Sequence, residues 1–153
     1  MSDFFSYGPP PAARSAPRAI LAELNGDDWE KFIGYAARRR YPAGAVVVQS
    51  GETRGALCFI ASGQVELRTV GAPKQARPTL RGEGEVFGVL SFLDAAPSEI
   101  SATVAAAAPA ELLMLTPDAL QQLAAWQPRI AMALLRDLGA HVAMRLRHLQ
   151  PGD

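Results

Sequence analysis

Short apolar runs and two-residue alternation between positions 40 and 115 predict a series of β-strands. Val65 and Leu67 alternate with Glu66 and Arg68, a period of two that places every second side chain on one face of a sheet. The other expected strands lie at 46–48, 57–60, 79–81, 101–106 and 111–115. Ser62-Gly63 is short enough to form a tight hairpin turn. Turn signals about every eight to twelve residues are typical of an antiparallel sandwich or barrel.

Helical patterns lie on both sides of these strands. Residues 18–24 predict a short helix that stops at Asn25-Gly26, and Asp27 to Glu30 has capping-box spacing for a second one. After the last strand, Thr116-Pro117-Asp118 predicts the start of a helix that runs to about Trp126. Pro128 then starts the longest helix of the chain.

The longest helix has an apolar stripe that is broader than packing on a small sheet requires. A glycine inside a helix costs about 1 kcal/mol relative to alanine, so Gly139 suggests close approach by another helix. We therefore predict an oligomer interface formed by Leu135, Leu138, Gly139, Val142, Leu146 and Leu149. The alternative is that this helix packs wholly on its own domain.

Composition limits both the architecture and the setting. At 153 residues, the chain is long enough for one domain with a sizeable core. Its fifteen basic and fifteen acidic residues cancel, and the longest run of one sign is Arg38-Arg39-Arg40. Cys58 is the only cysteine, which favours a reducing compartment, and no secretory signal or membrane-spanning segment is present. We expect a cytoplasmic protein with no membrane span.

The first 17 residues differ from the rest. They combine a run of prolines with Phe4, Phe5 and Tyr7, a composition that cannot form its own core. We predict a flexible tail at 1–17, either a plain leader or a peptide that docks a partner through these three aromatic residues. The predicted domain is 18–153, with N-terminal helices at 18–38, strands at 39–115 and C-terminal helices at 116–150.

Residues 84–95 and the strand after them carry the candidate chemistry. Phe87-Gly88-Val89-Leu90 offers a glycine at a close turn, followed by a short helix whose N–H groups suit an anion. The candidate ligand pocket comprises Phe87, Gly88, Val89, Leu90, Ser91, Ile100, Ser101 and Ala102.

Five segments in this order resemble the cyclic nucleotide-binding domain family from about residue 29 to residue 149. They are Tyr41-Pro42-Ala43-Gly44, Gly51-Glu52, 59–65, the cassette at 84–95, and Ser101-Ala102-Thr103-Val104. The resemblance implies an α+β fold, an antiparallel β-roll or jelly roll with short N-terminal helices and a long C-terminal helix. It also implies a cassette that grips a cyclic phosphate and its ribose.

The cassette departs from the family pattern at its two charged positions. The family places a glutamate where this chain has Val89, and an arginine where it has Ile100, or Ser98 if the register is taken from Pro97. Both registers lack the charge. Arg68, Arg77 or Arg81 could supply a cation from a neighbouring strand or loop, but each is more simply a solvent-facing charge. We therefore expect a self-filled pocket or one for an uncharged ligand.

Other candidate sites are weaker. His141, Met144 and His148 share a helical face that could ligate haem or copper, but lining a helix interface, with Asp137 beside His141, explains them more simply. We predict no metal, no cofactor and no enzymatic activity, because no base stands beside a nucleophile.

The resulting hypothesis is a degenerate, stand-alone cyclic nucleotide-binding-like module. It acts through protein contacts, as a homo-oligomer or as an accessory subunit of a larger assembly, and does not bind cyclic AMP in the usual way. Because only three residues follow Gln150, we expect no DNA-binding module. The alternative is a sensor in which a cyclic nucleotide or another small molecule shifts the C-terminal helix.

Overall fold

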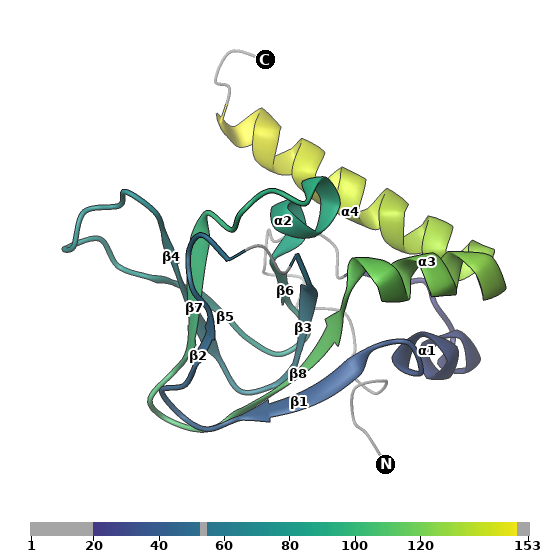
Figure 1. The fold of residues 1–153 in the computed structure, drawn as a ribbon, viewed down its shortest axis with the longest axis horizontal. Helices are drawn as coiled ribbons and strands as arrows, with labels where there is room; N and C mark the ends of the chain where they lie inside the picture. The colour runs from purple at the N-terminus through teal and green to yellow at the C-terminus, as the bar shows by residue number, and fades with distance from the viewer. Residues whose placement is uncertain (1–19, 53–54, 150–153) are drawn as a thin grey trace.

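The computed structural model describes residues 20–52 and 55–149, which form a β-roll flanked by helices (Figure 1). The helices are α1 (Gly26–Ile33), α2 (Val89–Asp94), α3 (Pro117–Trp126) and α4 (Pro128–Leu149). The strands are β1 (Ala37–Tyr41), β2 (Val46–Val48), β3 (Leu57–Ser62), β4 (Val65–Thr69), β5 (Thr79–Arg81), β6 (Val86–Phe87), β7 (Ile100–Val104) and β8 (Ala110–Leu115).

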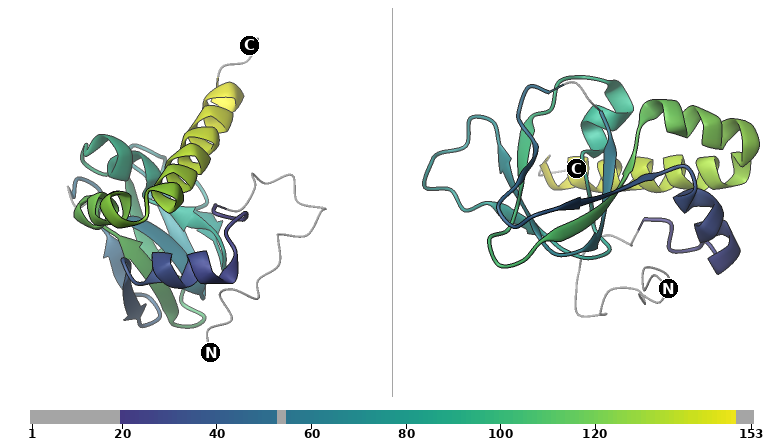
Figure 2. Two further views of the ribbon diagram at one scale, coloured as in Figure 1. Left: turned by 90° about the vertical axis from the view of Figure 1, so that its right-hand side faces the viewer. Right: turned by 60° about the horizontal axis from the view of Figure 1, so that its bottom comes forward.

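Two four-stranded sheets make up the roll. Their strand orders are β1-β8-β3-β6 and β2-β7-β4-β5, and every recorded pairing is antiparallel. Helices α1, α3 and α4 lie at one side of the roll, while the second sheet lies at the other (Figures 1 and 2). The α+β class, the antiparallel β-roll and the long C-terminal helix are thus confirmed.

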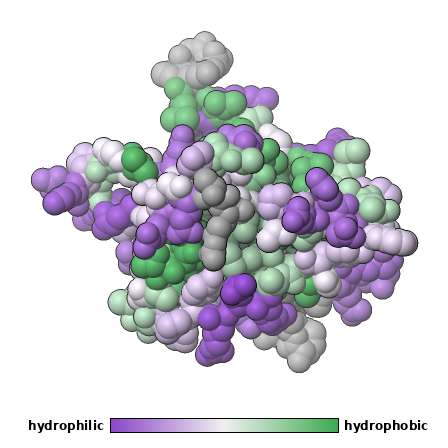
Figure 3. Space-filling model, in the orientation of Figure 1, coloured by the Kyte–Doolittle hydropathy of each residue, from purple (hydrophilic) through white to green (hydrophobic). Residues whose placement is uncertain are grey.

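Helix α4 extends beyond the roll at its C-terminal end. In Figure 1 this end rises past α2, and the same orientation in Figure 3 shows hydrophobic residues there. Near this end, Leu146 and Leu149 are 50% and 75% exposed, so the described residues leave an apolar surface uncovered there.

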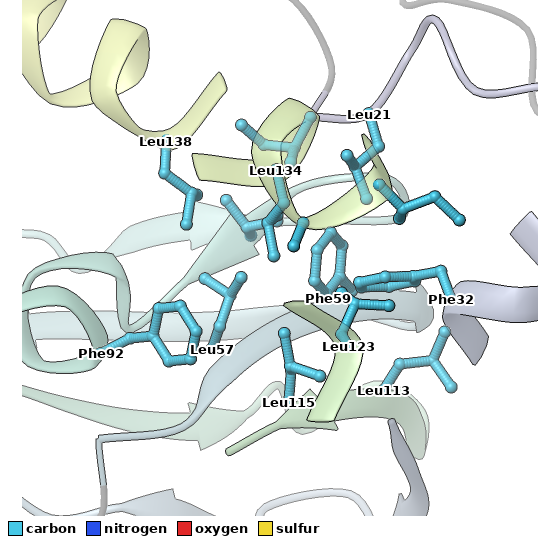
Figure 4. Packing of buried hydrophobic residues seen from close by; sticks show 14 of the residues in the cluster. Leu21, Phe32, Leu57, Phe59, Phe92, Leu113, Leu115, Leu123, Leu134 and Leu138 are labelled. Carbon is cyan, nitrogen blue, oxygen red and sulfur yellow. The ribbon is translucent and has the colours of Figure 1, made fainter. Parts of the chain in front are cut away.

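The inner side of α4 closes the larger of two hydrophobic cores. Ile130, Leu134 and Leu138 are fully buried in one cluster with residues of α1, α2, α3, β3 and β8 (Figure 4). Phe32 of α1 meets Phe59 of β3 edge to face, with 5.2 Å between ring centroids. Leu138, expected in the oligomer interface, is therefore a core residue, and Ile130 and Leu134 serve the same core.

The N-terminal region differs from the prediction at three places. Residues 20–23 form a turn where a helix was expected, and Leu21 has φ 62°. Asn25 starts the next helix by accepting a hydrogen bond from the Asp28 N–H at 2.8 Å, so the cap lies two residues before Asp27. Strand β1 starts at Ala37, two residues before the expected boundary. Its Arg-rich sequence lacked the alternation that marks a strand.

Two polar contacts join this N-terminal region to α4. The Leu21 N–H donates to Asp137 Oδ2 at 2.8 Å, and Arg129 Nη2 donates to Asp28 Oδ1 at 2.5 Å. Asp28 is buried, and its hydrogen bond with Arg129 lowers the pKa of its carboxyl group below 3.8. These contacts fix the start of α4 relative to α1 and to the turn at Leu21.

Gly63 connects two sheets and is not the centre of a hairpin. Strand β3 ends at Ser62 in the first sheet and β4 begins at Val65 in the second, so the expected hairpin turn is wrong. Gly63 has φ 87°, and a Cβ there would lie 2.6 Å from the Pro109 carbonyl oxygen. The crossing between the sheets therefore requires glycine for both backbone conformation and space.

Replacing Gly63 with alanine should lower the free energy of unfolding by about 2–4 kcal/mol, because left-handed strain and a steric clash add. Gly71→Ala is the matched control, since Gly71 has φ 82° and open space around its Cβ position. It should cost only the conformational part, about 1–2 kcal/mol. Urea unfolding measures both, and equal losses would contradict the steric argument.

Candidate functional site

The cassette is built around a tight strand-to-helix turn. Strand β6 ends at Phe87, Gly88 adopts φ 82°, and α2 follows directly. A Cβ on Gly88 would lie 2.7 Å from the Ala56 carbonyl oxygen, so no other residue fits without a shift of the backbone. The predicted short helix after Gly88 is present, and it ends at Ala95, which also has positive φ.

A small hollow lies beside this turn. Its volume is about 20 Å³, and its lining residues are Val48, Glu52, Gly55, Ala56, Phe87, Gly88, Ser91, Ser98, Ile100 and Met114. A cavity needs about 10–15 Å³ measured in this way to hold one water molecule. The hollow thus has room for about one water molecule and is far smaller than a nucleotide.

The charge in the hollow is negative. Glu52 is its one acidic lining residue, and none of the described lining residues is Arg or Lys. Glu52 Oε2 accepts a hydrogen bond from the Gln49 N–H at 2.6 Å. Because the described lining residues include this carboxylate and no cation, they offer an anionic phosphate no charge-assisted hydrogen bond.

The two serine hydroxyls at the hollow make bonds within the chain. Ser91 Oγ donates to the Ala96 carbonyl at 2.7 Å, while Ser98 Oγ donates to the Ile100 carbonyl at 2.8 Å. Their protons are therefore used by the cassette itself. Each oxygen retains some capacity as an acceptor, which again suits a donor ligand more than a phosphate.

The structure divides the expected pocket residues among several environments. Phe87, Gly88, Ser91 and Ile100 line the hollow. Val89 is buried in the core beneath α2, and Leu90 is 43% exposed. Ser101 is half-buried on β7, and Ala102 is fully buried between the sheets. The last four do not line the hollow, because the helical turn and the β7 pleat point their side chains elsewhere.

Six lining residues were absent from the sequence prediction of the pocket: Val48, Glu52, Gly55, Ala56, Ser98 and Met114. Ser98 had a detectable signal, since it stands at the family's arginine position in the alternative register. The others come from β2, the turn after it and β8, which only the roll brings to the cassette.

None of the three candidate cations lines the hollow. Arg68 Nη1 donates to the Ala76 carbonyl at 3.0 Å, and Arg81 Nη1 lies 3.4 Å from the Leu80 carbonyl. Arg77 is exposed in the β4–β5 loop. Arg68 and Arg77 are exposed, as expected for solvent-facing charges, whereas Arg81 is half-buried.

The two histidines of α4 differ in how far they are buried. His141 is half-buried and His148 is exposed, and no group of three or more His, Cys, Asp or Glu side chains within the described ranges could hold a metal ion. Burial lowers the pKa of His141 below 6.5, and the positive charges of Arg145 and Arg81 lower it further. Neutral imidazole is therefore favoured at this position.

The outer side of α4 carries the remaining interface candidates. Leu135, Leu146 and Leu149 are 40%, 50% and 75% exposed, and Met132, which the sequence prediction omitted, is 60% exposed. Val142 is half-buried against the core. A Cβ on Gly139 would meet nothing within 4 Å, so the domain itself does not require this glycine. Phe4, Phe5 and Tyr7 lie outside the described residues.

A family model, a relative of known sequence and a solved structure all match this chain. The family model for the cyclic nucleotide-binding domain matches residues 38–125. The cyclic AMP receptor protein of Thermus thermophilus is 36% identical over 125 residues, covering 81% of this chain and 55% of that protein. The crystal structure of Thermus thermophilus catabolite activator protein superimposes with a TM-score of 0.74 and 30% identity, over 86% of this chain and 59% of that one.

A second relative is a longer protein, of which this chain matches only a part. Glutaminase 2 of Bradyrhizobium diazoefficiens is 30% identical over 129 residues, which cover 84% of this chain and 20% of that protein. The chain thus spans about half of one relative and a fifth of the other. Within residues 20–52 and 55–149, no helix is long and apolar enough to cross a membrane.

Replacing His141 with glutamine should remove a pH-dependent loss of stability. Because the pKa of His141 is lower in the folded state, the unfolded chain binds the proton more readily, and stability falls as pH drops from 6.5 through the lower folded pKa. Urea unfolding above and below pH 6.5 tests this. His148→Gln, at an exposed position, should keep the wild-type pH dependence; the same pH dependence in both variants would contradict the assignment.

Proposed function

Since the chain belongs to the cyclic nucleotide-binding domain family, we propose that it is a degenerate member that acts through protein contacts and does not bind cyclic AMP in the usual way. In this role it is a homo-oligomer or an accessory subunit of a larger assembly. We place it in the cytoplasm, and its regulatory role involves no catalytic step.

The observation that carries this proposal is the combination of charge and size in the hollow. A cyclic phosphate needs a cation, and the described lining residues offer one carboxylate, Glu52, in a space of about 20 Å³. Each lost charge-assisted hydrogen bond removes about 1.5–3 kcal/mol of binding free energy. Two such losses weaken binding by roughly two to four decades.

The surface that supports the protein-contact role is the exposed apolar side of α4, at whose margin Val142 also packs against the core. Met132, Leu135, Gly139, Val142, Leu146 and Leu149 follow one another at three- and four-residue steps. This spacing forms the a and d seam of a coiled coil, and Gly139 at its middle allows two backbones to approach closely. We therefore assign the oligomer interface to these six residues, which we call the α4 seam, in place of the set that includes Leu138.

A second partner surface is proposed on sequence alone. The aromatic residues Phe4, Phe5 and Tyr7 provide apolar anchors for docking a different protein. This part of the proposal is separate from the α4 seam, since removal of residues 1–17 leaves every described core residue in place.

The second candidate function is a small-molecule sensor. The core shared by the cassette helix and α4 favours it: Phe92 of α2 and Leu138 of α4 belong to one buried cluster, with Leu57 of β3 near both in Figure 4. A ligand that displaced α2 would therefore act on α4 through this core. Such a ligand would have to enlarge the hollow and tolerate Glu52.

Thermal unfolding with and without millimolar cyclic AMP, cyclic GMP and cyclic dinucleotides should show no shift, because the hollow has room for about one water molecule and its described lining residues include no cation. A ligand present at 100 times its dissociation constant adds about 2.7 kcal/mol, which corresponds to a rise of about 5–10 °C in Tm for a domain of this size. Such a rise with one nucleotide would contradict the proposal of a degenerate cassette and support the sensor function.

Leu135→Glu should dissociate the homo-oligomer, since a carboxylate would be buried in the α4 seam without a partner. Leu80→Glu on β5 is the matched control, because Leu80 is 52% exposed and lies outside the seam. Sedimentation velocity should find a smaller species for the first variant only. A monomeric wild-type protein at all concentrations would contradict the homo-oligomer and leave only the accessory-subunit role.

A further inference from the structure

Strand β1 presents three consecutive arginines on the open edge of a sheet. In the order β1-β8-β3-β6, β1 is bonded to β8 on one side and to no described strand on the other. The backbone N–H and C=O groups that alternate along its outer side are therefore available for pairing. In Figure 1 β1 lies along the lower rim of the roll, and Figure 3 shows hydrophilic residues along this rim.

Both faces of this strand are open as well as its edge. The four residues from Ala37 to Arg40 are all exposed, and Tyr41 is half-buried with its hydroxyl 3.7 Å from Met114 Sδ. Alternation places Arg38 and Arg40 on one face and Arg39 on the other. A strand with four successive exposed residues contributes its backbone to the sheet but little side-chain area to the core.

The positive charge of β1 is only partly balanced. Arg38 Nη1 lies 3.3 Å from Glu111 Oε2, whereas Arg40, which stands directly opposite Glu111 in the β1–β8 register, makes no ion pair with it. Arg39 faces Leu112 across the strands. The guanidinium groups of Arg39 and Arg40 make no hydrogen bond or ion pair with any residue of the described chain.

These observations identify the chemistry of a partner. We propose that β1 binds an extended acidic peptide segment of another protein as an added strand, with its backbone completing the ladder and its carboxylates meeting the arginines. Directly opposite Cβ atoms on paired strands are about 4.5–5.5 Å apart, which places a glutamate side chain within reach of each guanidinium. Arginine can bind such a carboxylate through two parallel hydrogen bonds.

The same arginines argue against other occupants of the edge. A second copy paired through β1 would bring arginines close to one another across the new ladder, and like charges directly opposite are destabilising. Nucleic acid would use the charge but not the free backbone edge, and the chain as a whole has no net charge to attract it. An acidic extended peptide uses both features.

This inference rests on the proposal that the module acts through protein contacts, but it depends on neither the hollow nor the α4 seam. Failure of the nucleotide or sedimentation experiments would therefore not decide it. The competing explanation is that the arginines only protect an exposed edge from aggregation.

The test uses the full chain, labelled with nitrogen-15, and a short peptide in which glutamate alternates with threonine. Titration should shift the amide signals of residues 37–41 selectively. Arg39→Glu/Arg40→Glu should weaken binding at least about tenfold. The charge-matched control Lys74→Glu/Arg77→Glu, on the β4–β5 loop, should bind as the wild type does.

Two further probes separate strand addition from simple charge attraction. A peptide of the same composition that is N-methylated at alternate residues keeps its charges but cannot complete the ladder, so its binding should be lost. The proposal would be overturned if the methylated peptide bound as tightly as the unmethylated one, or if the loop control lost as much binding as the β1 variant. It would also be overturned by tighter binding of single-stranded DNA, or by the absence of a shift at residues 37–41.

Discussion

The burial of the inner face of α4 is the interaction on which the rest of the structure depends. Ile130, Leu134 and Leu138 enter a single core that also contains residues of α1, α2, α3 and the helix-facing side of the first sheet. A fully buried leucine contributes about 1.5–3 kcal/mol through removal of apolar area from water. These side chains hold together elements that no backbone ladder connects.

This core also determines what α4 offers to other molecules. Since its inner side is committed, the exposed apolar side chains lie beside the buried face, and this end of α4 extends past the roll. The contacts of Arg129 with Asp28 and of Asp137 with the Leu21 N–H restrict the orientation of α4 on this core. Hydrophobic burial tolerates rotation of a helix about its axis, whereas two polar contacts at separate turns restrict it.

The cassette of this chain has the family's glycine turn but differs from the family pattern at its charged positions. The glycine turn at Gly88 and the short α2 helix are retained, because the close Ala56 carbonyl and the core contact of Phe92 require them for folding. In the proposed degenerate cassette, the missing charges are not part of that packing, so their replacement leaves the fold intact. The consequence is a recognisable cassette whose hollow holds a carboxylate and no described cation. The two surfaces that we propose for protein contacts, the α4 seam and the β1 edge, differ in chemistry, one apolar and the other basic.

The sequence by itself determined the antiparallel strands, the cassette turn, and the extents of α3 and α4, because strand alternation, Pro117 and Pro128 at helix starts, and a glycine at a close turn are local signals, whereas the β-roll was implied by the family resemblance. It failed where the deciding contact is distant along the chain. Leu138 looked like an interface residue until the roll covered it, Gly63 looked like a hairpin turn although its neighbouring strands join different sheets, and the Arg-rich β1 had no apolar pattern to reveal it. Only the tertiary structure decided which face of α4 is free and which residues line the hollow. The physical reason is that periodicity shows that a face is apolar, whereas the surface that buries it comes from segments far apart in sequence.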